Sequence, residues 1–185
     1  MRRIRSTGWW RSLGSLYIAC MNALLVLPGY EFRLLLLRTL GGWQIGRETS
    51  IGRGCRITCR GRVRIGEVCN INQNVVIDGR GGVVIGDHVE IANGVRILSA
   101  GHDVRSFDFS YVKAPVEIRS RTWLATEAMV LLGVTMGSGS AAAARAVVTN
   151  SVPEGSIVGG VPARTIGTRP ANAQTVHARY RRFAH

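Results

Sequence analysis

Aliphatic residues recur at every sixth position of this chain and keep the same phase through long blocks. The longest block runs through Ile118, Leu124, Val130, Met136, Ala142 and Val148, and shorter ones run through Ile45, Ile51 and Ile57, through Ile65, Ile71 and Ile77, and through Ile85, Ile91 and Ile97. A hexapeptide period indicates a β-helix, in which stacked turns bury a core that no single turn could bury. A β-sandwich is the competing interpretation, but its strands would not hold a strict period of six.

The spacing between blocks predicts the shape of each turn. Ile45, Ile65 and Ile85 are each followed by Gly and stand twenty residues apart, which is three hexapeptides plus two residues. We therefore expect three-sided coils with one bulged corner. Ile97 and Ile118 are twenty-one residues apart where six would suffice. The surplus predicts a long loop over residues 99–115, and loops held on a rigid scaffold are where function concentrates.

Residues 1–44 precede the repeat and read as two short helices. The first covers an apolar stretch, residues 13–27, that is too short to span a bilayer comfortably, since a span takes about 20 residues. The second covers residues 30–40. Such helices could cap the open end of the coil, or they could lie in a membrane interface. We favour capping, and the two roles are compatible. The expected domains are a helical cap or membrane-associating segment over 1–44, a β-helix over 45–160 and a tail over 161–185.

The charge and the cysteine content indicate which binding partners, metals and compartment to expect. Lys and Arg number 24 against 11 acidic residues, a balance that favours polyanions in general. The arginines are scattered along the chain, which is typical of a solvated surface, so we expect no nucleic acid. The cysteines show neither a CxxC motif nor a zinc-finger spacing, and these are Cys20, Cys55, Cys59 and Cys69. We expect free thiols and no bound metal, in a protein that is cytoplasmic or peripheral at the inner face of the membrane.

Several motifs together resemble a known family. Residues 123–137 (WLATEAMVLLGVTMG), 147–153 (VVTNSVP) and 159–164 (GGVPAR) are similar to the carboxy-terminal signature of hexapeptide-repeat acyltransferases. Residues 101–103 (GHD), followed by 114–118 (APVEI), resemble sugar O-acetyltransferases of the colanic acid, maltose and galactoside type. The resemblance implies a left-handed parallel β-helix, a homotrimer with active sites between subunits, and acetyl-CoA as the acyl donor.

The resemblance also implies roles for individual residues. His102 matches the catalytic base, and Asn74 matches an asparagine that orients the acceptor hydroxyl. The backbone N–H of Thr126 falls where the family holds the thioester oxygen. The positions that line the coenzyme A channel are matched by Ala144, Thr149, Val161 and Arg164. This set suits direct acyl transfer, because a neutral imidazole can take the hydroxyl proton and a backbone N–H can stabilise the oxyanion.

Other residues leave alternatives open. Asp103 either orients His102 or caps the loop, and Asp78 is better explained as a turn residue than as a catalytic one. The loop aromatics either wall an acceptor pocket or pin the loop, and these are Phe107, Phe109 and Tyr111. We expect Trp123 in the core or at an interface.

The expected function is therefore transfer of an acetyl group from acetyl-CoA to a hydroxyl of a sugar or glycoconjugate, of the exopolysaccharide type. A non-sugar metabolite is the alternative acceptor. A non-catalytic scaffold is the alternative function, because Ala125, Ala143 and Arg145 stand where the family usually has glycine. A zinc-dependent carbonic anhydrase is disfavoured, since it needs three histidines per site and only His88 and His102 lie in the coil.

Overall fold

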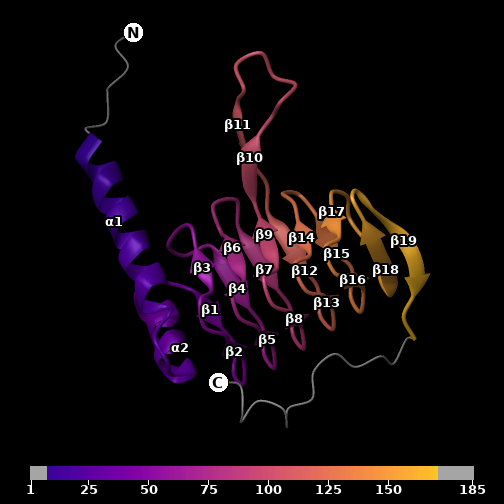
Figure 1. Cartoon of the computed structure of the whole chain (residues 1–185), viewed down its shortest axis with the longest axis horizontal. Helices are drawn as coiled ribbons and strands as arrows, with labels where there is room; N and C mark the ends of the chain where they lie inside the picture. Colours follow the sequence, from indigo (N-terminus) through magenta and orange to yellow (C-terminus); the bar gives the residue numbers. More distant parts are fainter. Residues whose placement is uncertain (1–7, 171–185) are drawn as a thin grey trace.

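The structure is a computed structural model that describes residues 8–170, with side chains from residue 12 onward. Two helices, α1 (Gly8–Leu24) and α2 (Tyr30–Thr39), precede a solenoid of short strands (Figure 1). Most of the expected tail, residues 161–185, lies outside the described residues. No helix within residues 8–170 is long and apolar enough to cross a membrane.

Three sheets run along the solenoid, one on each side of the coil, and we call them A, B and C. Sheet A contains β1 (Gln44–Ile45), β4 (Val63–Ile65), β7 (Val83–Ile85), β12 (Val116–Ile118) and β15 (Thr135–Met136). Sheet B contains β2 (Ser50–Ile51), β5 (Asn70–Ile71), β8 (Glu90–Ile91), β13 (Trp123–Leu124), β16 (Ala141–Ala142), β18 (Ser156–Gly160) and β19 (Ala163–Thr168). Sheet C contains β3 (Arg56–Ile57), β6 (Val76–Asp78), β9 (Arg96–Leu98), β14 (Met129–Val130) and β17 (Val147–Val148).

The strands of successive coils pair in parallel and in register, which confirms the β-helix expected from the sequence. In sheet A, Ile65 pairs with Ile85, and Ile85 with Ile118. The period-six residues thereby form columns inside the coil, where they are almost fully buried. Each column is continuous because every coil covers the apolar residues of the coil below it.

The corner between sheets B and C, which we call the BC corner, forms a straight ridge. Its residues stack through backbone hydrogen bonds: the N–H of Asn74 donates to Arg53 O at 3.1 Å, and the N–H of Arg145 donates to Thr126 O at 2.9 Å. The corner requires positive φ, which Asn74 adopts at 58° and Arg145 at 59°. A non-glycine residue in this conformation is uncommon, so the fold tolerates side chains where glycine would be the simpler choice.

The long excursion at residues 99–115 is a β-hairpin rather than an irregular loop. Strands β10 (Ala100–His102) and β11 (Tyr111–Lys113) pair antiparallel, with His102 opposite Tyr111. The hairpin leaves the corner between sheets C and A, here called the CA corner, and projects away from the coil (Figure 1).

The two helices cap the first coil, and one side chain meets the open edge of each sheet. The carboxamide of Asn22 accepts from the Ile57 N–H at 2.8 Å and donates to Ile57 O at 3.0 Å, on sheet C. The Arg33 guanidinium donates to Ile51 O at 2.9 Å on sheet B. Arg38 donates to the Ile45 carbonyl of sheet A at 3.1 Å. These bonds satisfy backbone groups that an uncapped solenoid would leave open.

Candidate active site

His102 stands at the end of β10 with its ring fixed by the hairpin. Its Nδ1 lies 2.9 Å from the Phe109 carbonyl oxygen. A carbonyl can only accept, so Nδ1 carries the hydrogen and Nε2 of the neutral ring keeps its lone pair. The Phe109 ring stacks on the imidazole with centroids 4.5 Å apart, and the Tyr111 ring meets it edge-on at 5.6 Å. Phe109 and Tyr111 thus position His102 directly. Within residues 8–170, no hydrogen bond joins Asp103 to the His102 ring. The Asp103 carboxylate accepts from the Arg105 N–H instead.

The base of the hairpin rests on an ion pair between the buried Asp78 carboxylate and the exposed Arg80 guanidinium. The Asp78 carboxylate accepts from Arg80 Nε at 2.9 Å and from an Arg80 terminal nitrogen at 2.8 Å, and Thr58 donates to it at 2.6 Å. Burial alone would raise the pKa of Asp78, but the hydrogen bonds from Arg80 and Thr58 lower it below its ordinary value. The Arg80 guanidinium also lies over the Tyr111 ring, 5.8 Å from its centroid. Asp78 is the last residue of strand β6 rather than a turn residue, and its carboxylate holds Arg80 and Thr58 in place.

Asn74 lies on the BC corner and lines a cavity of about 520 Å³ between α1 and the first two coils. The cavity wall combines three residues of the α1 end with corner residues of the coil, and these are Asn22, Ala23, Val26, Arg53, Gly54, Arg56, Gln73 and Asn74. We call this cavity the Asn74 pocket. It is polar and cationic on the side of the coil and apolar on the side of the helix.

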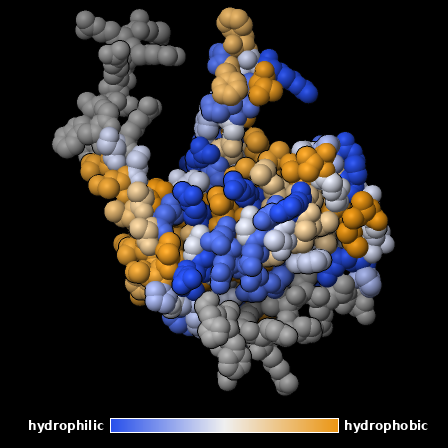
Figure 2. Space-filling view, viewed as in Figure 1, coloured by the Kyte–Doolittle hydropathy of each residue, from blue (hydrophilic) through white to orange (hydrophobic). Residues whose placement is uncertain are grey.

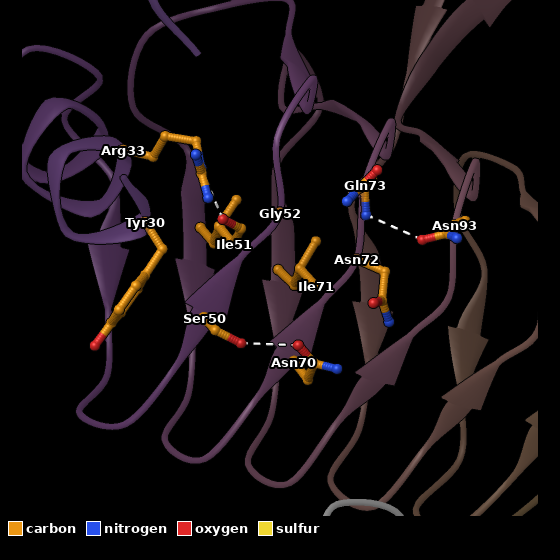
Figure 3. A pocket seen from close by; sticks show the side chains of 10 residues that line it. All are labelled: Tyr30, Arg33, Ser50, Ile51, Gly52, Asn70, Ile71, Asn72, Gln73 and Asn93. Atoms are coloured by element: carbon orange, nitrogen blue, oxygen red, sulfur yellow. Dashed lines mark hydrogen bonds between the residues drawn. The ribbon is translucent and has the colours of Figure 1, made fainter. Parts of the chain in front are cut away.

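A second pocket, of about 310 Å³, lies on the other side of the same corner, over the outer face of sheet B (Figure 3). A polar ladder crosses it: Ser50 donates to Asn70 at 2.8 Å, and Asn70 and Asn72 both donate to Glu90 at 2.9 and 3.0 Å. Tyr30 and Arg33 of α2 form its far wall. Sequence reasoning named no residue of this pocket as functional, although the closely spaced amides of residues 70–74 could have marked it.

Thr126 and Ala144 lie on the BC corner above Asn74. Both residues are exposed, and the backbone N–H of Thr126 hydrogen bonds to no group of the described chain. This N–H is therefore available as a donor. Arg145, next to Ala144, donates from Nε to Glu127 at 2.7 Å, so its guanidinium is held along the ridge.

The remaining predicted coenzyme A contacts are spread over the far end of the solenoid. Thr149 follows β17 at the CA corner, Val161 lies in the turn between β18 and β19, and Arg164 lies in β19. All three are exposed, and an Arg164 terminal nitrogen donates to Ala163 O at 3.0 Å. Trp123, expected in the core or at an interface, is 44% exposed on the outer face of sheet B, so it is not a core residue.

A single chain does not bring the predicted catalytic residues together. His102 lies on the CA side of sheet C, whereas Asn74 and Thr126 lie on the BC side. Among the described residues there is no group of three or more His, Cys, Asp or Glu side chains that could hold a metal ion. All four cysteines are free, and burial raises the pKa of the Cys55 thiol to about 11.

Comparison with known proteins places this geometry in context. No family model matches the chain. WcaF of Escherichia coli K12, named for acetyl transfer in colanic acid biosynthesis, is 29% identical over 161 residues, which cover 87% of this chain and 85% of WcaF. A hexapeptide-repeat acetyltransferase of Vibrio cholerae, solved with acetyl-CoA, has a TM-score of 0.77 and 28% identity, over 89% of this chain and 91% of that one.

A galactoside acetyltransferase solved with coenzyme A has a TM-score of 0.78 over 91% of this chain and 86% of that one. Its identity of 22% supports a shared fold and no more. The sequence similarity to WcaF and to the Vibrio cholerae protein, in contrast, extends over nearly all of the described coil. In sequence and in fold, the chain is therefore a relative of the hexapeptide-repeat acetyltransferases.

Proposed function

We propose that this chain is an O-acetyltransferase that moves the acetyl group of acetyl-CoA to a hydroxyl of a sugar or glycoconjugate. The observation that carries the proposal is the orientation of His102. Its Nδ1 faces the Phe109 carbonyl oxygen at 2.9 Å, which leaves Nε2 as a free base at an exposed position. The relatives add support, since WcaF is named for colanic acid biosynthesis and the Vibrio cholerae acetyltransferase was solved with acetyl-CoA.

In the proposed reaction, His102 Nε2 takes the proton of the acceptor hydroxyl as its oxygen attacks the thioester carbonyl. The oxyanion that forms is stabilised by the Thr126 N–H, and Asn74 orients the acceptor. When the tetrahedral intermediate collapses, the C–S bond breaks and the imidazolium returns its proton to the departing sulfur. Ala144, Thr149, Val161 and Arg164 line the donor channel at the far end of the coil. No covalent enzyme intermediate is needed.

This scheme needs more than one copy of the chain. His102 and Asn74 lie on opposite sides of sheet C, so a site that uses both would take each from a different copy. A closed cyclic trimer, the state implied by the resemblance, would form three such sites. We include the homotrimer in the proposal.

The first test is calorimetric titration of the full-length protein with acetyl-CoA, which requires no knowledge of the acceptor. We expect saturable binding with one site per chain. Absence of binding would favour a non-catalytic scaffold. The Arg145–Glu127 ion pair favours that alternative, because it lies on the ridge beside Ala144, a predicted coenzyme A contact.

The second test is a rate measurement with acceptors found by screening sugars and glycoconjugates. His102→Ala should lower the rate by about 10²–10⁴, the usual contribution of a general base. His88→Ala is the matched control, because His88 is exposed at a different corner and should leave the rate unchanged. An unchanged rate in His102→Ala would refute the assignment.

A third measurement separates the two pockets at the BC corner. Asn74→Ala should lower the rate far more than Asn72→Ala if the acceptor binds in the Asn74 pocket. The reverse order would move the acceptor to the sheet B pocket, where the Asn72 carboxamide donates to Glu90 and to Ile91 O. Both variants need a check of folding, since Asn74 holds a positive φ.

For location, we propose the cytoplasm, with the helical cap at the inner face of the membrane. Acetyl-CoA as the donor and four free cysteines favour a reducing compartment. The exposed apolar residues of the cap favour membrane contact.

A further inference from the structure

The Asn74 pocket has an unusual charge for a site that would bind neutral hydroxyls. Two of its lining residues are arginines, Arg53 and Arg56, and both are exposed. Arg53 shares the corner with Asn74, whose N–H donates to Arg53 O at 3.1 Å. Arg56 begins β3, and its N–H donates to Val75 O at 2.8 Å. Both arginines therefore lie one coil away from Asn74, on either side of Gly54.

A third arginine extends this cluster along the outer face of sheet C. Arg56 pairs with Val76, and Val76 pairs with Arg96, so the two arginines lie two strands apart on one face. Adjacent strands are about 4.8 Å apart, which places the two backbones about 10 Å from each other. One carboxylate-bearing sugar could reach the Arg56 side chain, and a longer glycan could reach both.

The cluster has no acidic counterpart in the chain. All 11 acidic residues fall within the described residues, and none of them forms an ion pair with Arg53, Arg56 or Arg96. The ion pairs among the described residues lie elsewhere, for example between Arg47 and Glu67 at 3.4 Å and between Arg145 and Glu127 at 2.7 Å.

Arg53 also repels a neighbouring cation. Burial lowers the pKa of Arg33 on the other side of the corner, and the positive charge of Arg53 lowers it further, against an opposing effect of Cys55. Cations gathered without anions raise the energy of the free protein, and a bound anion would relieve this repulsion.

The donor does not account for the cluster. The predicted coenzyme A contacts lie on the last coils, from Ala144 to Arg164, whereas Arg53 and Arg56 lie on the first coil beside the helical cap. The phosphates of coenzyme A would therefore bind away from these arginines. The group that meets them must come with the acceptor.

We propose that the acceptor is an anionic glycan, whose carboxylate or phosphate group is bound by Arg53 and Arg56 while Asn74 orients the hydroxyl that is acetylated. This inference deepens the proposed function and rests on it. Guanidinium groups bind both anions through paired hydrogen bonds, and such charge-assisted bonds are stronger than neutral ones. Arg96 would meet a second charge on a longer chain.

The test is equilibrium binding to the full-length protein, measured by calorimetry at low and at physiological salt. A hyaluronan tetrasaccharide supplies carboxylates, and chitotetraose is a neutral probe of the same length. Glucose 6-phosphate and glucose form the second pair. We expect each anionic probe to bind at least about tenfold more tightly than its neutral partner, a difference that a single charge-assisted contact can supply. Which anionic probe binds better identifies carboxylate or phosphate as the recognised group.

Variants connect the binding to these residues. Arg53→Gln and Arg56→Gln should each weaken the anionic probe about tenfold and leave the neutral probe and acetyl-CoA unchanged. Arg64→Gln is the matched control, because Arg64 is an exposed arginine on the outer face of sheet A and should have no effect.

Three results would overturn the inference: equal binding of anionic and neutral probes, an equal effect of Arg64→Gln, or a change of oligomeric state in Arg56→Gln, which would make the cluster a subunit contact. The inference and the proposed function fail separately. Acetylation of neutral acceptors with no preference for charge would sink only the inference. Anion binding at Arg53 and Arg56 without any acetyl transfer would sink the enzymatic function and leave only an anion-binding site.

Discussion

Gly54 shows how closely the backbone of the first coil supports Asn74. It occupies the BC corner with φ +75°, a conformation that costs other residues about 1–2 kcal/mol. A β-carbon placed on Gly54 would collide with the Asn74 side-chain oxygen. The glycine therefore serves the backbone and also leaves room for the carboxamide above it.

We predict that Gly54→Ala lowers acetyl transfer at least about tenfold while it destabilises the fold by only about 1–2 kcal/mol. The methyl group would displace the Asn74 carboxamide from the pocket. Gly94→Ala is the matched control, since Gly94 lies on the same corner with φ +71° and its β-carbon would approach Glu127 rather than Asn74. Rates and thermal unfolding of both variants decide the matter, and equal loss of rate in the two would contradict it.

The helical cap is the element on which the first coil depends. Arg33 is 3% exposed, and its guanidinium bonds both to Ile51 O and to Leu27 O at 2.9 Å. It thereby joins the sheet B edge to the loop between the helices. Arg38 also bonds to the coil, but it remains exposed to water.

We therefore predict that Arg33→Met lowers the free energy of unfolding by about 1–3 kcal/mol, because the Ile51 and Leu27 carbonyls would lose a charged donor. Arg38→Met should cost less, since water can replace its bonds. Urea unfolding followed by circular dichroism measures both. If Arg38→Met were the more damaging change, Arg38 rather than Arg33 would be the main link between the cap and the first coil.

The strands and helices were predictable from the sequence, whereas the contacts between them were not. The period of six placed the strands, because Ile65, Ile85 and Ile118 must face inward in every coil. The cap was predicted as two helices, but the bonds of Asn22 and Arg33 to strand edges depend on tertiary approach and leave no periodic signal. The orientation of His102 likewise depends on the Phe109 carbonyl across the hairpin, seven residues away. The sequence alone did not predict the arginine cluster. Arg56 and Arg96 are forty residues apart in sequence, and only the register of the paired strands brings them to one face of sheet C.

At the scale of the whole molecule, the separation of His102 from Asn74 makes the number of copies testable by activity. We predict that His102→Ala and Asn74→Ala, each inactive alone, regain activity when the two chains are co-expressed. With random assembly of equal amounts of the two chains, about a quarter of all sites in the cyclic trimers would combine a wild-type His102 with a wild-type Asn74. Light scattering of the same samples gives the mass of the assembly. Mixed trimers without any recovery of activity would refute the shared arrangement.

The outer surface of the cap exposes many apolar side chains to solvent. Figure 2 shows apolar side chains gathered over α1 and α2. The exposed large apolar residues of this region are Leu13, Leu16, Val26, Leu27, Tyr30, Phe32, Leu35 and Leu40. An apolar helical face on a protein of net charge +13 is suited to the interface of an anionic bilayer, where both burial and attraction contribute.

We predict that the full-length protein floats with vesicles of phosphatidylcholine and phosphatidylglycerol and floats less with phosphatidylcholine alone. A triple variant with serine at Leu13, Leu16 and Leu35 should lose at least about tenfold in vesicle affinity, because each exposed leucine would otherwise bury apolar surface in the interface. A matched triple serine variant at Val84, Val104 and Ile166, which are exposed away from the cap, should float as the wild type does. Equal flotation of the two variants would rule out the cap as the membrane-binding surface. Any vesicle binding would then have to come from the positive charge of the protein alone.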